Sequence, residues 1–162
     1  MGRLLGLDFG TKRVGAALSD ARRAIATPLE VYERRDKDRD AEHFIKIIKE
    51  YDVERLVVGL PLHTGGGEGE LAVLARRWGE WLAGETGRPV TFFDERYTSV
   101  DAEESLRGHG LKARRRKGLR DMLAARILLQ NYIDAGCPVV AVLPEPLDDP
   151  TDEDQSDSAG SM

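Results

Sequence analysis

Acidic residues that stand where predicted elements begin or end are the side chains of this sequence best suited to chemistry. Asp8 comes at the end of an apolar segment, just before the backbone must turn at a glycine. Asp94 and Glu95 end a second apolar segment, and Asp121 begins a predicted helix. Carboxylates from separate segments have one common chemical use, which is to hold hard divalent cations through oxygen.

The same acids also fit ordinary structural roles. Asp8 could hydrogen-bond the backbone of its turn, and Asp121 could be an acid of a first helical turn, stabilised by the helix dipole. Ala124 and Ala125 favour the metal hypothesis, because small residues let a helix lie close to a sheet and would bring Asp121 toward the other acids. Such a cluster would repel itself without a cation. Spacing alone leaves both interpretations open.

A basic run precedes Asp121 directly. It contains no acid and seven cations, which are Arg107, Lys112, Arg114, Arg115, Arg116, Lys117 and Arg120. A flexible cationic segment beside a carboxylate cluster suits a polyanionic substrate, because each phosphate contact releases condensed counterions. The alternative is a solvated loop, which is what most charge runs are.

A glycine-rich loop is predicted over residues 60–69, after a buried strand. It lacks the pattern of a nucleotide-binding P-loop and the spacing of a dinucleotide fingerprint. Its glycines would allow backbone amides to approach a phosphate, or they belong to a mobile loop. Composition favours the mobile loop.

The elements that must position these residues follow from apolar periodicity. The pattern predicts an N-terminal antiparallel hairpin followed by alternating helices and strands, and hence an α/β fold with a mixed sheet. Pro28 indicates that its strand lies at an edge. Trp78 and Trp81 are expected in the core or at an interface. We expect strands over 3–9, 14–19, 24–29, 55–59, 90–93 and 139–143, and helices over 38–51, 70–85, 99–108 and 119–135.

Length and charge indicate one folded domain with an acidic tail. The chain has 162 residues and a net charge of −5. Seven of its 29 acidic residues and none of its 24 basic ones lie in 144–162, so residues 1–143 carry a net charge of +2. We expect 1–143 to form the domain and 144–162 to be disordered.

One cysteine excludes an internal disulfide and a Cys-based zinc cluster. With no apolar run long enough for a membrane span, we expect a cytoplasmic protein.

Four segments together resemble the YqgF/RuvX family. They are GLDFGTKRVG at 6–15, VVGLP at 57–61, DERYTS at 94–99 and DMLAARILLQ at 121–130, in order and at suitable spacing. The resemblance covers about residues 3–143. It implies a ribonuclease-H-like fold and a nuclease that acts on Holliday junctions or on precursor 16S ribosomal RNA.

The resemblance also implies roles for particular residues. Asp8, Glu95 and Asp121 would be the catalytic triad that binds Mg²⁺ or Mn²⁺, with two ions hydrolysing a phosphodiester bond. The choice of Glu95 over Asp94 rests on the family. The substrate backbone would be contacted by Lys12, Arg13, Arg96 and Thr98. It would also be contacted by six residues of the basic run, which are Lys112, Arg114, Arg115, Arg116, Lys117 and Arg120.

The substrate and the oligomeric state stay open at this point. Junction resolution needs two symmetric cuts and therefore predicts a homodimer, whereas trimming of RNA does not. Two rival functions compete with the nuclease. One is a nucleic-acid-binding module without catalysis, and the other is a phosphotransferase related to actin and sugar kinases, which also carry an Asp-x-Gly-Thr hairpin. The phosphotransferase needs two such domains, and 162 residues hold one.

Overall fold

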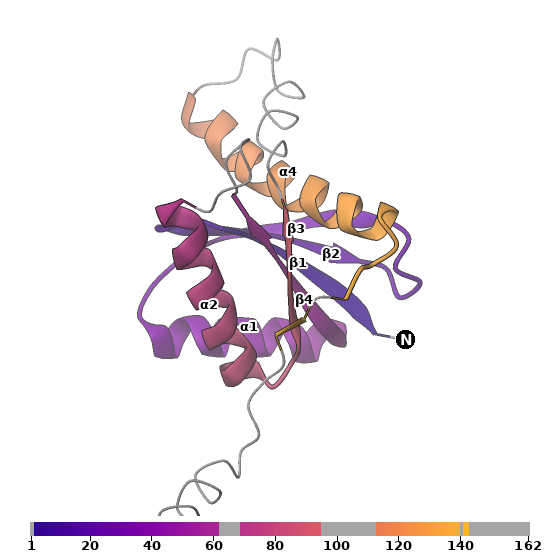
Figure 1. Cartoon of the computed structure of the whole chain (residues 1–162). Coiled ribbons are helices and arrows are strands. Elements are labelled where there is room, and N and C mark those ends of the chain that lie inside the picture. Colours follow the sequence, from indigo (N-terminus) through magenta and orange to yellow (C-terminus); the bar gives the residue numbers. More distant parts are fainter. Residues whose placement is uncertain (1, 62–68, 95–112, 140, 143–162) are drawn as a thin grey trace, which may run out of the picture.

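The computed structural model describes residues 2–61, 69–94, 113–139 and 141–142. Figure 1 shows a twisted sheet with helices on both of its faces. The elements are β1 (Arg3–Phe9), β2 (Arg13–Ser19), β3 (Ala26–Glu33), α1 (Lys37–Tyr51), β4 (Val53–Leu60), α2 (Glu70–Thr86), β5 (Val90–Asp94), α4 (Ala113–Asp134) and β6 (Ala141–Val142).

Six strands of the described part form one sheet in the order β3-β2-β1-β4-β5-β6. β1 pairs antiparallel with β2 and parallel with β4, and β5 continues the parallel part. The predicted mixed sheet and N-terminal hairpin are therefore confirmed. β3 lies at the edge, as Pro28 indicated, and a register shift in its partner strand follows Ala16. Proline is tolerated there because an edge strand needs fewer backbone donors.

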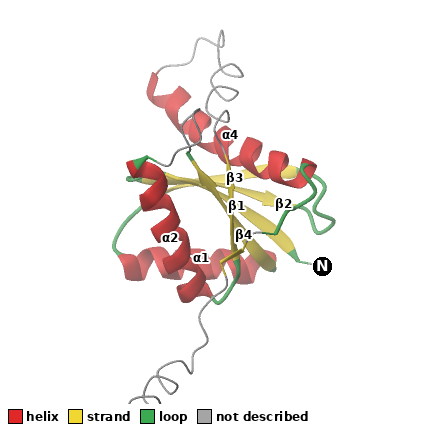
Figure 2. Ribbon diagram, viewed as in Figure 1, coloured by secondary structure: helices red, strands yellow, loops and turns green. Residues whose placement is uncertain are grey.

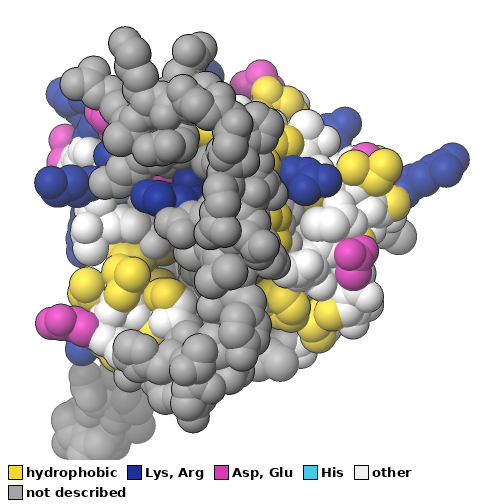
Figure 3. All heavy atoms as spheres, turned by 90° about the horizontal axis from the view of Figure 1, so that it is seen from above, with side chains coloured by type: hydrophobic (Ala, Val, Ile, Leu, Met, Phe, Trp, Pro, Cys, Tyr) yellow, Lys and Arg dark blue, Asp and Glu magenta, His cyan; other side chains and the backbone are white. Residues whose placement is uncertain are grey.

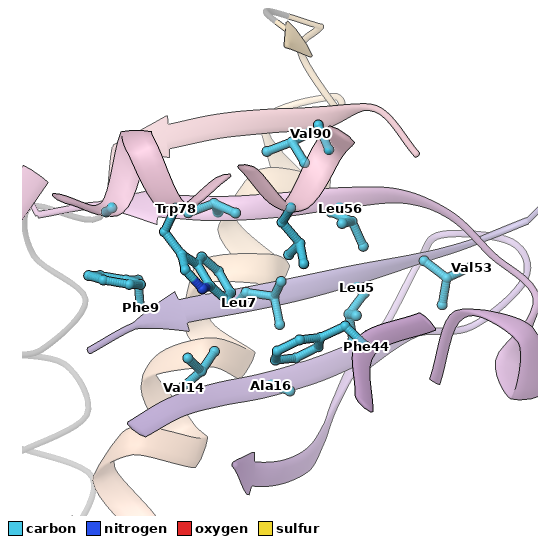
Figure 4. Packing of buried hydrophobic residues seen from close by; sticks show 14 of the residues in the cluster. Leu5, Leu7, Phe9, Val14, Ala16, Phe44, Val53, Leu56, Trp78 and Val90 are labelled. Atoms are coloured by element: carbon cyan, nitrogen blue, oxygen red, sulfur yellow. The ribbon is translucent and has the colours of Figure 1, made fainter. Parts of the chain in front are cut away.

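The helices divide between the two faces of the sheet. α1 and α2 cover one face, and α4 crosses the other (Figures 1 and 2). β1 contributes side chains to the cores on both faces of the sheet, because successive side chains of a strand point to opposite faces. Leu5 and Leu7 enter the core under α1 and α2, whereas Leu4 enters the core under α4. In the larger core, Trp78 of α2 lies between Phe9 and Phe44 (Figure 4).

α4 packs directly on the backbone of the hairpin. A Cβ added at Gly15 would overlap the carbonyl oxygen of Asp121 and would lie 3.0 Å from its carbonyl carbon. A Cβ at Gly6 would lie 2.8 Å from Cβ of Leu129. Ala125 is fully buried in this contact. The small residues that the sequence offered after Asp121 thus do allow the predicted close approach.

The side chain of Gln130 fastens α4 to the edge of the sheet. Its amide nitrogen donates to the carbonyl of Ala24 at 3.1 Å, and its amide oxygen accepts from the backbone N–H of Ala26 at 2.9 Å. Both bonds satisfy backbone groups where β3 begins. They fix the position of α4 along the hairpin as well as its distance from the sheet.

The start of α4 corrects the sequence interpretation of the basic run. The helix was expected from about residue 119, but it begins at Ala113. Arg114, Arg115, Arg116 and Lys117 therefore belong to a helix and not to a loop. Apolar periodicity missed this part because it reports burial, whereas Ala, Arg and Lys have high helix propensity without burial. Asp121 is consequently not a first-turn acid.

The buried face of α2 is narrower than its apolar residues suggest. Trp78 and Leu82 are buried, but Leu71 and Leu74, which continue the same helical spacing, are 39% and 40% exposed. The inward positions between them are small residues, including Ala75 and Gly79. A Cβ at Gly79 would lie 2.6 Å from the ring of Phe92. Small residues face the sheet because this helix lies close to it.

Several expected features lie outside the described residues. They are the helix over 99–108, the tail over 144–162, most of the glycine-rich loop and the site residues Glu95, Arg96, Thr98 and Lys112. Within the described ranges, the structure contains no helix that is both long enough and apolar enough to cross a membrane.

The close packing at Gly15 leads to a first prediction. Gly15→Ala should destabilise the fold by about 1–3 kcal/mol, because the new methyl group must displace the backbone of α4. Gly84→Ala is the matched control, since a Cβ there meets nothing within 4 Å and Ala is favoured over Gly in a helix by about 1 kcal/mol. Urea unfolding of both variants measures the difference. Equal stability of the two variants would show that the α4 contact is not tight.

Candidate active site

Asp8 and Asp121 meet at the same glycine. Asp8 is the penultimate residue of β1, and it pairs across the hairpin with Gly15. Gly15 in turn lies against the backbone of Asp121. Asp8 follows Leu4 and Gly6 in the two-residue period of the strand, so its side chain lies on the face that α4 covers. Two of the predicted acids, 113 positions apart in number, therefore share one end of one sheet face.

Arg13 binds one of these acids directly. Its Nε donates to Oδ2 of Asp121 at 3.1 Å, and the two side chains are 28% and 24% exposed. Arg13 begins β2 two residues before Gly15, so it lies on the same face of the sheet. The sequence predicted Arg13 as a phosphate contact. In this structure its guanidinium neutralises a predicted metal ligand.

The turn between β1 and β2 is held in place by Arg34, a residue that the sequence analysis missed. Nη1 of Arg34 donates to the carbonyls of Gly10 and Thr11 at 3.2 and 3.1 Å. Its backbone N–H donates to the carbonyl of Lys12 at 2.9 Å. No local pattern could have identified Arg34, because it follows β3 and meets the turn only through the folding of the sheet. Lys12 itself is exposed on this turn.

Asp40, at the start of α1, orders the segment that carries Arg34. Its Oδ1 accepts from the Tyr32 hydroxyl at 2.6 Å and from the backbone N–H of Arg35 at 2.8 Å. Burial of the phenol, together with this hydrogen bond, raises the pKa of Tyr32 to about 12. Tyr32 therefore stays protonated at neutral pH and keeps donating to Asp40.

The strand period of β5 decides the face on which its last residue, Asp94, lies. Val90 and Phe92 face the core under α1 and α2, and Asp94 follows them in alternation. Phe93 faces the opposite side, where it packs against Tyr132 of α4 at a centroid distance of 5.5 Å. Asp94 thus belongs to the face opposite Asp8. Glu95 lies outside the described residues.

Basic residues lie near this end of the molecule. α4 carries Arg120 immediately before Asp121, and the helical segment that includes Arg114–Lys117 precedes it. Seen from above, Lys and Arg side chains lie at several places on this face of the molecule (Figure 3). Whether they contact a substrate stays a prediction.

The donor set matches a hard divalent cation in part. Carboxylate oxygens are the ligands that Mg²⁺ and Mn²⁺ prefer, and Asp8 and Asp121 bring such oxygens to one end of one face. The described ranges hold no group of three His, Cys, Asp or Glu residues that could bind a metal. The third predicted ligand, Glu95, is not among them. The two acids present therefore fit a metal site that needs a further ligand.

Comparison with solved structures establishes the class of the fold. T. thermophilus RuvC, solved in complex with a Holliday junction substrate, aligns with a TM-score of 0.51 at 16% sequence identity. The alignment covers 85% of this chain and 96% of RuvC. The fold is thus of the ribonuclease-H-like class, as the resemblance implied.

The chain belongs to the RuvX family, described as Holliday junction resolvase, which it matches over residues 2–135. A relative from Rhodopirellula baltica is 37% identical over 134 residues, which cover 83% of this chain and 78% of the relative. Another, from Chloroflexus aurantiacus, is 42% identical over 132 residues, which cover 82% and 86%. Both relatives are named as pre-16S rRNA nucleases. The family resemblance is confirmed, and the family is one of nucleases.

The ion pair between Arg13 and Asp121 leads to a second prediction. A double-mutant cycle of Arg13→Ala and Asp121→Asn, followed by urea unfolding in the presence of a chelator, should give a coupling energy of about 0.2–1 kcal/mol. The value is small because solvent reaches both side chains, and it should fall as salt is added. Strictly additive single effects at low salt would contradict the pairing.

Proposed function

We propose that this chain is a metal-dependent endonuclease that hydrolyses phosphodiester bonds of structured nucleic acid, with Asp8, Glu95 and Asp121 as its catalytic acids. The observation that carries this proposal is the meeting of Asp8 and Asp121 at Gly15 in a member of a nuclease family. Carboxylates that gather at one site repel each other, and a shared cation removes this repulsion. Arg13 supplies one positive charge there.

The proposed cofactor is a pair of Mg²⁺ or Mn²⁺ ions. When bound, such ions activate a water molecule and stabilise the leaving oxygen of the phosphodiester. Asp8 would bind the ions from a central strand of the sheet. Asp121 would bind from α4 and Glu95 from the segment after β5. Because the hairpin and α4 are packed without a gap, Asp8 and Asp121 are positioned before any substrate arrives.

Basic residues would hold the substrate backbone. Arg13 is fixed beside Asp121, so a phosphate at the acids would also lie next to its guanidinium. Lys12 is exposed at the hairpin turn. Arg114–Lys117 and Arg120 lie on α4 ahead of Asp121, and we propose that they contact phosphates farther along the strand. Arg96, Thr98 and Lys112 are proposed for the same role from the sequence.

Two substrates are supported by the relatives. The family description names the Holliday junction, and the two curated relatives are named for precursor 16S rRNA. Either substrate would be met in the cytoplasm, where we expect this chain to act. Resolution of a junction would require a homodimer, because two cuts related by symmetry need two active sites. Processing of RNA would need only one.

The deciding experiment compares wild type with Asp8→Asn in Mn²⁺ on two labelled substrates, a synthetic four-way DNA junction and an RNA that spans a pre-16S 5′ end. We expect Asp8→Asn to lose at least about 100-fold in cleavage rate, because loss of a group that only orients a metal ligand already costs 10- to 100-fold. Circular dichroism checks that the variant is folded.

The pattern of cleavage identifies the substrate. Symmetric nicks in the junction assign a dimeric resolvase, and cutting of the RNA alone assigns a maturation nuclease. If wild type and Asp8→Asn cut equally, or if neither substrate is cut, the nuclease proposal fails and a non-catalytic nucleic-acid-binding module takes its place.

A further prediction distinguishes Asp94 from Glu95 as the proposed ligand. Asp94→Asn should keep most of the cleavage activity, since Asp94 lies on the sheet face opposite Asp8. Glu95→Gln should lose at least about 100-fold, like Asp8→Asn. Single-turnover cleavage in Mn²⁺ measures both. The reverse order of effects would make Asp94 the ligand.

A further inference from the structure

A cavity lies on the other side of the hairpin from the acids. It has a volume of about 250 Å³ and is enclosed by the end of β1, the hairpin turn, the start of α1 and the outer part of α2. This is below the roughly 300–1,000 Å³ of pockets that enclose a drug-sized molecule, so it suits a single flat ring system. Its lining is Phe9, Thr11, Arg34, Lys37, Asp40, Leu74, Arg77, Trp78 and Trp81.

Aromatic rings form the apolar part of this cavity. The rings of Phe9 and Trp78 are tilted with centroids 5.2 Å apart, and Trp78 is 6% exposed. Trp81 lies one turn farther along α2, with the ammonium of Lys37 6.0 Å from its ring centroid. The chain has two tryptophans, Trp78 and Trp81. Aromatic rings with cations nearby are typical surfaces for stacking of a nucleobase.

Two buried donors at the cavity lack acceptors within the described part of the protein. Nε of Arg34 and Nε1 of Trp78 are both buried without a hydrogen bond. Asp40, the acid of the cavity, is 4.0 Å from Nε of Arg34 and already accepts from Tyr32 and Arg35. Buried N–H groups without acceptors are costly. A ligand with acceptor atoms on its edge would satisfy them, and every nucleobase carries such atoms.

The charges around the cavity suit a phosphate. Three cations, Arg34, Lys37 and Arg77, face one acid, Asp40. Lys37 and Arg77 are exposed at the rim, while the guanidinium of Arg34 lies 5.0 Å from the ring centroid of Phe9. A base in the cavity would therefore have its phosphate beside exposed cations.

The position of the cavity relates it to the proposed active site. Phe9 lines the cavity, and its neighbour Asp8 faces the opposite side of the same strand. Between the two sides lies the hairpin turn, of which Thr11 belongs to the cavity. A nucleic-acid strand that crosses this turn would present one phosphate to Asp8 and a nearby base to the cavity.

We propose that this cavity binds one unpaired base of the substrate strand, stacked on the ring of Trp81 and bonded by the N–H groups of Trp78 and Arg34, with its phosphate on Lys37 and Arg77. The inference rests on the proposed function, because it takes the ligand to be part of the nucleic acid that is cut. It adds a specificity: a substrate with an unpaired base beside the cleaved bond is preferred.

Tryptophan fluorescence tests the proposal, since both tryptophans lie in the cavity. The full chain is titrated, with a chelator present so that no cleavage occurs, with a short single-stranded RNA, the same RNA with abasic sites, and a nucleoside monophosphate. We expect saturable quenching by the intact RNA, binding at least about 5-fold weaker for the abasic strand because stacking is lost, and weaker binding still for the monophosphate.

Two lysines of α1 provide a matched pair of variants. Lys37 and Lys46 are both exposed, but only Lys37 lines this cavity. Lys37→Ala should weaken RNA binding and lower the slope of log K against log salt by about 0.7, the contribution of one phosphate contact in a single strand. Lys46→Ala should leave both unchanged.

The outcomes separate this proposal from the nuclease assignment. Equal binding of intact and abasic RNA, no quenching, or equal effects of the two lysine variants would each overturn the base-binding cavity while leaving cleavage untouched. Monophosphate that binds as tightly as RNA would overturn the assignment to a substrate strand. Loss of the nuclease proposal, by contrast, would be seen only in the cleavage experiment.

Discussion

α4 rests directly on the backbone of the β1–β2 hairpin at Gly6 and Gly15, where no side chain holds it away. Much of the candidate site depends on this contact. It places Asp121 next to the strand pair that carries Asp8, and it brings Asp121 within reach of Arg13. The hydrogen bonds of Gln130 fix the position of this helix along the hairpin. The position of the acids is therefore a property of backbone packing, which is stiffer than the position of flexible side chains.

The alternation of β1 gives the hairpin a different chemistry on each face. Asp8 lies on the face that α4 covers, where Arg13 pairs with Asp121, while its neighbour Phe9 lies toward α2, where it packs against Trp78. One strand end thus serves a polar, charged region and an aromatic cavity that are separated only by the sheet. Arg34 connects them, because it holds the turn carbonyls and also lines the cavity. A change in the turn would therefore alter both the charged region and the aromatic cavity.

Two acids of the described part, Asp121 and Asp40, have neighbouring groups that compensate their negative charge. Arg13 partly neutralises Asp121, and Asp40 accepts two hydrogen bonds from the segment that leads into α1. The Arg13–Asp121 pair, which solvent reaches, contributes little to stability, so its main effect is on geometry: it holds the carboxylate and the guanidinium group in defined positions. A polyanion approaching the hairpin would meet Lys12 and Lys37 on the surface.

Residue types and local periodicity were enough to predict the hairpin, the mixed sheet and the edge position of β3. Four motifs indicated the family, and Asp8 and Asp121 were among the candidate acids. These features depend on neighbouring residues in the chain. Tertiary structure alone decided that Asp94 and Asp8 lie on opposite faces of the sheet, and that Arg13 bonds a carboxylate 108 positions away. It alone assembled the cavity from β1, α1 and α2. Those features depend on distances between remote segments, and packing of the helices on the sheet sets such distances.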